Sequence, residues 1–549
     1  MATTKFPRKL FEKEIGKLDE KMQDRVVMFG TTIESLTDTE LEIDVLSDRP
    51  DFLSYHGFKR SFLAFLGKKT GLKEYKLNKP EKDFHITVES SVEDVRPFTA
   101  CAIVKNLKLD DEKIKEIIEL QEKIHNTLGR KRKKLAIGIY PLEKIKLPIT
   151  YKAMEPDQIK FIPLEMEKEM DGLQILQRHP AGRDYAHLLA GKVKFPIFID
   201  ANNNILSMPP IINSQLTGKV TEQTKDIFVE CSGFDFDSLS KCLNIIVTNF
   251  AEMGGEIYQM EVKYKKVKIT PDLTPEKNPI SLENTNKILG LTLTEKELKS
   301  LLEKMGHNYE KGIVESPAWR VDLLHEVDLI EDVAKAYGYE NFIPEIPQIS
   351  TIGKIDSKEE IKKKIADILA GVGMLEVSNL HLTNKREQFT NMGIQEKQEK
   401  GYIPLEGSKT DYNILRKDLS HYAMKILAEN VDNEYPQKIF ETGRVFNLTQ
   451  ANKIIEEEHL SLAITPGNFT ELKQIIEYLF RMLNLQISLK EPKDSKGWMI
   501  DGRDAEIILD NKAIGAFGEI HPKILKNWKV KMPVALLELD LEEVFKKLM

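Results

Sequence analysis

Five carboxylates fall within one segment of eleven residues, and this density is the clearest sign of chemistry in the sequence. They are Asp322, Glu326, Asp328, Glu331 and Asp332. Carboxylate oxygens are the preferred ligands of hard divalent cations such as Mg²⁺. Asp328, Glu331 and Asp332 recur at helical spacing and are predicted to share one helix face, whereas Glu326 points closer to the other side.

The helix that would carry these acids is amphipathic. Its apolar stripe consists of Ile330, Val333, Ala334 and Tyr337, and Gly338 follows it as a C-terminal cap. Like charges three and four residues apart repel by about 0.2–0.5 kcal/mol per pair, so the acids do not help the helix to form. A solvated acidic face, with the first acids favoured by the helix dipole, is the simplest interpretation of this segment alone.

A second copy of the same pattern stands near the N-terminus. Residues 49–51 read Arg-Pro-Asp, and residues 320–322 read Arg-Val-Asp. A glycine lies sixteen residues after each aspartate, at Gly67 and Gly338. Each stretch also follows a helical segment that ends in an apolar residue and a glycine. The sequence therefore predicts two copies of one small α/β unit.

The acid cluster is present in only one of the two copies. The positions matching Asp328, Glu331 and Asp332 hold Gly57, Arg60 and Ser61. The unit therefore folds without the acids, and this favours a specific role for them in the second copy. That role is a Mg²⁺ site or, because Mg²⁺ usually takes only one or two protein carboxylates, pairing with basic groups of a partner.

The composition of the chain is that of a globular protein with several domains. Its 549 residues are 41% hydrophobic and 30% charged, with a net charge of −7, so any contact with RNA must be local or shared with a partner. Three scattered cysteines indicate a reducing compartment, without a disulfide framework or a zinc site. We find no apolar signal core and no membrane span of ~18 residues, and expect a cytoplasmic protein.

Turn signals and composition divide the chain into four predicted domains of the α+β class. Residues 1–85 and 271–347 are the two related small α/β units. Residues 86–265 alternate strands, turns and two amphipathic helices, which is typical of a mixed α/β domain. Residues 350–549 open with a helix and continue with strands joined by turns, which predicts an antiparallel sheet flanked by helices.

Two features of the middle domain are typical of a small-molecule pocket. Glu230 lies inside an apolar strand, where its carboxylate must find a hydrogen-bond donor or lose its charge. The loop at Pro209 and Pro210 is rigid and continues into Asn213 and Ser214, and rigid polar loops often line pockets. A purely structural double-proline turn explains the loop equally well.

Other polar residues of this domain have simpler interpretations. His179 and His187 border a glycine-containing turn, where a histidine beside apolar residues is most often a satisfied core residue. Residues 130–134 are all basic, and such a run is more often a solvated patch than a contact for RNA. The sequence contains no Walker A loop, no GxGxxG after a strand, no HExxH and no GxSxG.

Several segments, in their order along the chain, resemble the β subunit of phenylalanine–tRNA ligase. They are "SDRPDFLSYHGFKRSFLAFLG", "RKRKKLAIGIYPL", "SPAWRVDLLHEVDLIEDVAKAYGY", "FETGRVF" and "IGAFGEIHPKIL…VALLELDLEEVF". The resemblance spans essentially the whole chain. The length is similar to that of the archaeal and eukaryotic-cytosolic form, without the oligonucleotide-binding insertion and anticodon-binding domain of the long bacterial form.

The resemblance implies an enzyme of two α and two β subunits that attaches phenylalanine to its tRNA with ATP. The α subunit carries the aminoacylation site. Residues 350–549 then correspond to a class II synthetase-like domain that has lost its chemistry and contacts the α subunit. Glu441 and Arg444 agree with that loss, because they stand in the wrong order for the pair that grips ATP.

The resemblance also gives the polar residues expected roles. It implies that Asp322, Asp328, Glu331 and Asp332 bind Mg²⁺ at a site shared with the α subunit. It identifies the middle domain with an editing module that hydrolyses tyrosine wrongly attached to the tRNA. The expected editing residues are His187, Glu230 and the loop residues Pro209, Pro210, Asn213 and Ser214.

Two other classes of function stay open at this point. The chain could be a scaffold that binds the α subunit and tRNA without hydrolysing anything. It could also be a free-standing deacylase, although such an enzyme would not need the synthetase-like domain.

Overall fold

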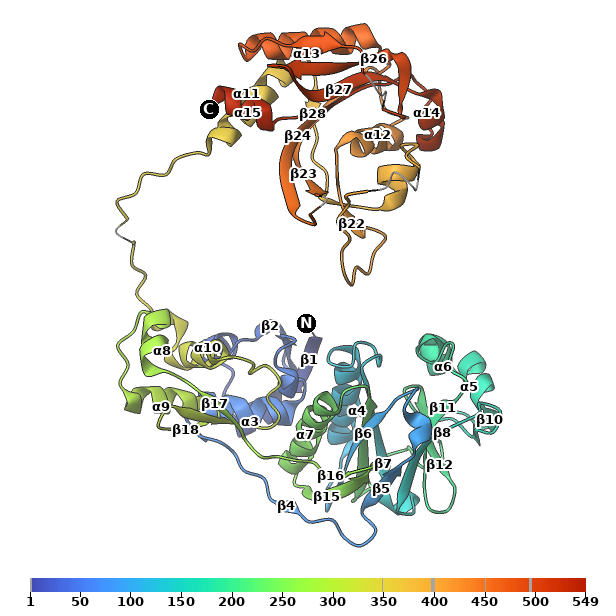
Figure 1. Ribbon diagram of the computed structural model, residues 1–549. Helices are drawn as coiled ribbons and strands as arrows, with labels where there is room; N and C mark the ends of the chain where they lie inside the picture. Colours follow the sequence, from blue (N-terminus) through green and yellow to red (C-terminus); the bar gives the residue numbers. More distant parts are fainter. Residues whose placement is uncertain (1, 348, 396–399, 450, 493–495) are drawn as a thin grey trace. The chain divides into compact units, whose positions relative to one another are not determined.

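The structure is a computed structural model that describes residues 2–347, 349–395, 400–449, 451–492 and 496–549 (Figure 1). It contains two compact units, residues 1–346 and 347–549. Each unit mixes helices with β-sheets, as the sequence predicts. Within the described residues, no helix is both long and apolar enough to cross a membrane.

The first unit begins with a small antiparallel sheet of three strands in the order β1-β3-β2. Two helices connect the first two strands, and a third follows the sheet. The elements are β1 (Ala2–Pro7), α1 (Arg8–Glu14), α2 (Glu20–Met28), β2 (Thr32–Leu36), β3 (Glu40–Val45), η1 (Pro50–Phe52) and α3 (Tyr55–Phe65).

The same arrangement recurs at the end of the first unit. Three antiparallel strands have the order β17-β19-β18, again with two helices after the first strand and one after the last. The elements are β17 (Glu276–Pro279), α8 (Leu282–Leu289), α9 (Glu295–Lys304), β18 (Asn308–Glu310), β19 (Ile313–Ser316) and α10 (Glu326–Tyr337). The chain therefore contains the two copies that the Arg-x-Asp pattern predicts.

The Arg-x-Asp pattern makes the same local contact in both copies. Arg49 donates from Nε and Nη2 to the two carboxylate oxygens of Asp51, at 2.9 and 2.8 Å. Arg320 donates in the same way to Asp322, at 2.8 and 2.6 Å. A two-pronged pair of this kind fixes the chain rigidly where it leaves the sheet and enters the following helix.

A large mixed sheet lies between the two copies in sequence. Its strand order is β13-β12-β11-β8-β5-β15-β6-β14-β7, with β4 and β16 also paired to β15. Its strands are β4 (Leu77–Asn78), β5 (His85–Val88), β6 (Phe98–Lys105), β7 (Leu135–Pro141), β8 (Ile149–Met154), β11 (Phe195–Ile199), β12 (Ile205–Met208), β13 (Ile212–Asn213), β14 (Ile227–Gly233), β15 (Glu256–Lys263) and β16 (Val267–Thr270).

Two long amphipathic helices, α4 (Asp111–Asn126) and α7 (Phe236–Glu252), cover one face of this sheet (Figure 1). Two short helices, α5 (Gly172–Arg178) and α6 (Pro180–Tyr185), follow the hairpin of β9 (Lys160–Phe161) and β10 (Met170–Asp171). Because β4 and β16 pair within this sheet, the middle domain reaches beyond the expected limits of 86 and 265 at both ends.

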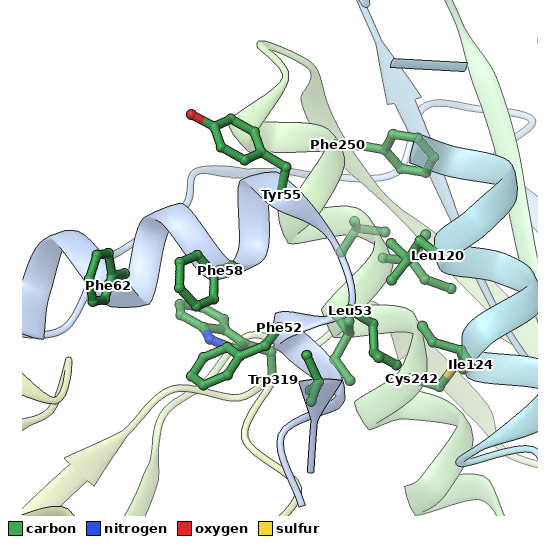
Figure 2. Packing of buried hydrophobic residues seen from close by; sticks show 14 of the residues in the cluster. Phe52, Leu53, Tyr55, Phe58, Phe62, Leu120, Ile124, Cys242, Phe250 and Trp319 are labelled. Atoms are coloured by element: carbon green, nitrogen blue, oxygen red, sulfur yellow. The ribbon is translucent and has the colours of Figure 1, made fainter. Parts of the chain in front are cut away.

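One apolar core joins the first small unit, α4 and α7 (Figure 2). Leu53 of the first copy belongs to the same cluster as Leu120 and Ile124 of α4 and Cys242 of α7. Trp319 of the second copy also belongs to it. Continuous packing therefore joins the two small units to the helices α4 and α7 of the middle domain.

The second unit contains a sheet of seven strands in the order β20-β23-β24-β28-β27-β26-β25, antiparallel except for the pair β20–β23. Helices pack on both faces, around two apolar clusters. The strands are β20 (Leu375–Glu376), β23 (Gln437–Leu448), β24 (Ile454–Thr465), β25 (Ser488–Lys490), β26 (Met499–Leu509), β27 (Lys512–Ile520) and β28 (Ala535–Asp540). The helices are α11 (Ser357–Gly371), α12 (Ser420–Glu429), α13 (Phe469–Met482), α14 (Pro522–Trp528) and α15 (Glu542–Leu548).

Candidate functional site

The large sheet curls until strands near its two ends meet, and a cavity of about 580 Å³ lies there. The hydroxyl of Tyr140, on β7, lies 2.7 Å from Oγ of Ser207, on β12. These strands stand at opposite ends of the strand order, so this contact closes the sheet on itself. Helix α4 and the double-proline loop form the other walls of the cavity.

Glu230 lies in this cavity wall with its side chain only 2% exposed. Its neighbour Cys231 contacts Cys242 of α7, and successive strand residues face opposite ways, so Glu230 points away from that helix. Its Oε1 lies 3.3 Å from the Tyr140 hydroxyl, and its Oε2 has no hydrogen-bond partner among the residues that the structure describes. Glu230 is therefore a buried and incompletely paired carboxyl group in the wall of the cavity.

The neighbouring strand β7 leaves room for the Glu230 carboxyl group and the Tyr140 hydroxyl group. Gly138 on β7 pairs with Glu230 in register, and a Cβ at Gly138 would lie 2.5 Å from Glu230 Oε1. Burial raises the pKa of Glu230 to about 8, although the charge of Arg96 works to lower it. Near neutral pH the carboxyl is therefore largely protonated and can either donate or accept a hydrogen bond.

The double-proline loop forms part of the cavity wall. Pro209, Pro210 and Asn213 line it. Arg132 holds the loop in place, because its Nη1 donates to the carbonyl of Ile211 at 2.9 Å while its Nη2 donates to a glutamate of α4. One member of the basic run is thus a structural residue, and the other four are exposed.

Two expected pocket residues lie elsewhere. His187 is exposed on a short 3-10 turn after α6 and does not line the cavity. His179 lines it instead, because the turn between α5 and α6 carries it inward, where its Nε2 donates to the carbonyl of Leu164 at 3.1 Å. Ser214 is buried beside the cavity, and its Oγ accepts from the backbone of Leu216, so it serves the turn.

The acidic helix α10 uses its carboxylates in different ways. Asp328 is a capping residue: its carboxylate accepts the backbone N–H groups of Leu324 and His325, both at 2.7 Å. Glu331 is exposed and lies 3.0 Å from Nζ of Lys335, one turn along the helix. Neither contact brings the two acids together.

The prediction that Asp332 shares a solvated face with these acids is wrong. Its side chain is 2% exposed, with Oδ2 2.8 Å from His307 Nε2 and 2.9 Å from Arg320 Nη1. Leu329 and Ala336 are also buried beside it, so the buried face of α10 is wider than the apolar stripe indicates. Burial works to raise the pKa of Asp332, but the ion pair with Arg320 and the hydrogen bond to His307 lower it well below its usual range.

The Asp322 carboxylate is also paired within the chain, because both of its oxygens accept hydrogen bonds from Arg320. Burial opposes the effect, but this pair lowers the pKa of Asp322. Among the described residues, no group of three or more His, Cys, Asp or Glu side chains is arranged to hold a metal ion. The four acids therefore do not fit a cation site built from this chain alone.

Comparisons with known proteins cover the whole chain. Residues 279–339 match the tRNA synthetase B5 domain, and residues 343–541 match the phenylalanyl tRNA synthetase beta chain CLM domain. The phenylalanine–tRNA ligase beta subunit of Thermococcus sibiricus is 40% identical over 91% of this chain and 90% of its own length, and that of Archaeoglobus fulgidus is 37% identical over 97% of each. The chain belongs to the phenylalanine–tRNA ligase beta subunit family. It is therefore part of an aminoacyl-tRNA synthetase, as the sequence predicts.

A solved structure supports the fold of the first unit. An N-terminal fragment of the phenylalanyl-tRNA synthetase beta subunit from Pyrococcus horikoshii has a TM-score of 0.59 and 37% identity. The match covers 61% of this chain and 99% of the fragment. The fold of the small units and the large sheet is thus one already seen in a phenylalanine–tRNA ligase beta subunit.

The second unit of this beta subunit holds Glu441 and Arg444 in internal ion pairs. Glu441 is buried and accepts from Arg416 at 2.7 Å and from the side chain of Asn379 at 2.6 Å. Arg444 lies within 3.1 Å of both Glu456 and Glu458. The Glu441 side chain is therefore fully used within the unit, whereas Arg444 is half-exposed and pairs with acids of the neighbouring strand.

Three residues at or next to the cavity wall of this beta subunit were not predicted from the sequence: Arg132, Tyr140 and Gly138. Tyr140 stands in an apolar strand where only its hydroxyl could have drawn notice. Gly138, two residues earlier, interrupts that strand, and a glycine inside a strand indicates a close approach to it. Arg132 was hidden inside a run of basic residues whose other members are exposed.

Proposed function

We propose that this chain removes tyrosine wrongly attached to the tRNA for phenylalanine, in the cavity beside Glu230. The observation that carries the proposal is the incompletely paired carboxyl group of Glu230, buried in the wall of the cavity. Tyrosine differs from phenylalanine by one hydroxyl, and an apolar pocket rejects an added hydroxyl by only about 10²-fold. A second site that hydrogen-bonds the hydroxyl discriminates the other way, since phenylalanine would leave its polar group unpaired.

In this proposal Glu230 is a selectivity residue that contacts the tyrosyl hydroxyl. His125 and His179 line the cavity, but each ring already uses both nitrogens in hydrogen bonds within the chain. Neither is therefore free to take a proton from water. The cavity then leaves activation of the attacking water to the ribose hydroxyl of the tRNA, with Asn213 able to orient it.

We further propose that the beta subunit supports ATP-dependent aminoacylation by an α subunit, in an assembly of two α and two β chains. The buried pair of Glu441 with Arg416 supports the placement of the aminoacylation site on the partner. ATP–pyrophosphate exchange by the purified chain with phenylalanine should be absent. Exchange in this assay would show that the second unit has kept its chemistry.

The end of α10 where the chain enters the helix is the best candidate for a contact with that α subunit. Leu324 is 85% exposed, and Val327 is also exposed, one turn before the exposed Glu331. Exposed apolar residues beside a charge are typical of a protein interface. Because Asp322 and Asp332 are internally paired, a Mg²⁺ ion at this place would need most of its ligands from the partner or from water.

Deacylation of purified tyrosyl-tRNA and phenylalanyl-tRNA tests the editing proposal against the scaffold alternative. The full chain with its α partner should hydrolyse tyrosyl-tRNA faster. Gly138→Ala should suppress this hydrolysis, because its Cβ would collide with the Glu230 carboxyl and the Tyr140 hydroxyl and displace both groups. Gly371→Ala, whose Cβ would meet no atom within 4 Å, is the matched control. Failure of the wild-type assembly to hydrolyse either substrate would favour the scaffold.

A further inference from the structure

A second cavity, of about 500 Å³, lies where the two small units face each other in the first compact unit. Its wall includes α3 and residues 69–73 of the first copy, and Gly306, Trp319 and Arg320 of the second. One carboxylate, Glu252 of α7, and six cations line it. The cations are Arg49, Lys59, Arg60, Lys69, Lys73 and Arg320.

Four of these cations are neutralised within the chain. Arg49 pairs with Asp51, and Arg320 pairs with two aspartates of the second copy. Lys59 pairs with Glu14 of α1 at 2.9 Å, and Lys73 pairs with Glu252. Arg60 and Lys69 remain, and within the described part of the chain neither has a carboxylate oxygen within 4 Å.

Arg60 is the more informative of the two, because it is only 8% exposed. Its guanidinium lies 4.0 Å from the centre of the Trp319 ring, and its Nη1 donates to the Tyr75 hydroxyl at 3.1 Å. Its Nε has no hydrogen-bond partner among the described residues. Tyr75 in turn donates to Glu252, so that carboxylate is already shared between Tyr75 and Lys73. A buried charge with an unused N–H is costly unless an anion joins it.

The repeat shows that this positive wall is not required by the fold. The residue matching Arg60 in the second copy is Glu331, and the residue matching Ser61 is Asp332. The first copy therefore presents a guanidinium and a hydroxyl where the second presents two carboxylates. Ser61 also lines the cavity. The same helix position has thus become anion-attracting in one copy and acidic in the other.

We propose that this cavity binds the phosphate group of a small molecule. Its volume is in the range of small-ligand sites, and a fixed guanidinium is well suited to phosphate oxygens. Arg60 would supply a buried positive charge at the cavity wall and Lys69 a charge at the rim, with Ser61 able to donate from its hydroxyl. The phosphate could be free inorganic phosphate or pyrophosphate, or part of a nucleotide. This site is independent of the editing proposal, because it lies in a different cavity.

Calorimetric titration of the full chain at constant ionic strength tests the proposal with inorganic phosphate, pyrophosphate and ATP as separate probes. Saturable binding is expected with at least one of them. If pyrophosphate or phosphate binds as well as ATP, the phosphate alone is recognised, and if only ATP binds, the nucleoside contributes as well. Arg60→Met should weaken binding about ten- to hundredfold, by loss of charge-assisted hydrogen bonds.

Arg25→Met is the matched control, because Arg25 also lies over an aromatic ring, that of Phe65, but does not line the cavity. Its affinity should equal that of the wild type. Should Arg60→Met fail to fold, the Ser61→Asp variant provides the test. It places at the cavity wall the carboxylate that the second copy has at the matching position, Asp332, and should abolish phosphate binding. No saturable binding of any probe, or unchanged affinity in Arg60→Met or in a folded Ser61→Asp variant, would overturn the proposal.

Discussion

Asp332 and Glu230 are both 2% exposed carboxyl groups of the first unit, yet their surroundings differ in one decisive way. Asp332 is matched by Arg320 and His307, and its pKa is lowered. Glu230 contacts the Tyr140 hydroxyl at 3.3 Å, its second oxygen has no hydrogen-bond partner among the described residues, and burial raises its pKa to about 8 although Arg96 works to lower it. Full pairing is typical of a structural acid, whereas a buried acid that is incompletely paired beside a cavity is a candidate for a functional residue.

The largest expected effect on stability comes from removing Arg320, the partner of Asp332. Arg320→Met leaves Asp322 and Asp332 buried without their cation, and breaking a buried pair in this way costs about 3–5 kcal/mol. Arg49→Met leaves only Asp51 without its partner and should lower the unfolding free energy by a smaller amount. Urea unfolding measures both free energies. Equal stability of the Arg320→Met variant and the wild type would break the distinction between the two acids.

The two acids should affect the pH dependence of stability differently, because the pKa of Glu230 is raised and that of Asp332 is lowered. Between pH 5 and 8 folded Glu230 keeps a proton that the unfolded chain has released, so its contribution to stability falls by up to about 1.4 kcal/mol per pH unit as pH rises. Glu230→Gln should remove that slope and gain stability relative to the wild type toward pH 8. Urea titrations at pH 5, 6, 7 and 8 measure it.

Asp332→Asn is the matched control for that titration. The lowered pKa of Asp332 means that its stabilisation is lost only as pH falls below about 4. Its removal should therefore shift the unfolding free energy by a constant amount from pH 5 to 8. The same slope in both variants would show that the two carboxyls do not differ as described.

Smaller effects on stability are expected from two other acids of α10, Asp328 and Glu331. Asp328→Ala removes the acceptor of two backbone N–H groups and should lower stability by about 1 kcal/mol. Glu331→Ala is the control and should change stability by no more than about 0.5 kcal/mol, because its pair with Lys335 is exposed. Thermal unfolding checks both. This differs from the expectation from helical spacing alone, under which loss of either acid would only relieve repulsion.

The sequence predicted the repeat because its signals are local. The Arg-x-Asp pairs and the glycines after each helix report backbone geometry, and the structure shows both pairs in the same conformation. The burial of Asp332 could not be predicted in this way. It depends on His307 and Arg320, which lie twelve or more residues away along the chain and meet α10 only in the folded unit.

The candidate pocket shows the same limit. Glu230 was predictable, because a charged residue inside an apolar strand is anomalous without knowledge of its neighbours. The choice between His179 and His187 was not, since both border one turn and only the packing of α6 decides which faces inward. Tyr140 gave no signal at all, because its role rests on a contact between distant strands of the curled sheet.

The selectivity of hydrolysis by the Glu230→Ala variant tests the central claim most directly. Single-turnover deacylation of tyrosyl-tRNA and phenylalanyl-tRNA should be measured for the assembled enzyme, with Glu165→Ala, an exposed acid at the same cavity, as the control. The account predicts slower hydrolysis of tyrosyl-tRNA with phenylalanyl-tRNA cleaved as fast as before or faster. Equal slowing of both substrates, or no change in either, would contradict the assignment of Glu230 as the residue that recognises the tyrosyl hydroxyl.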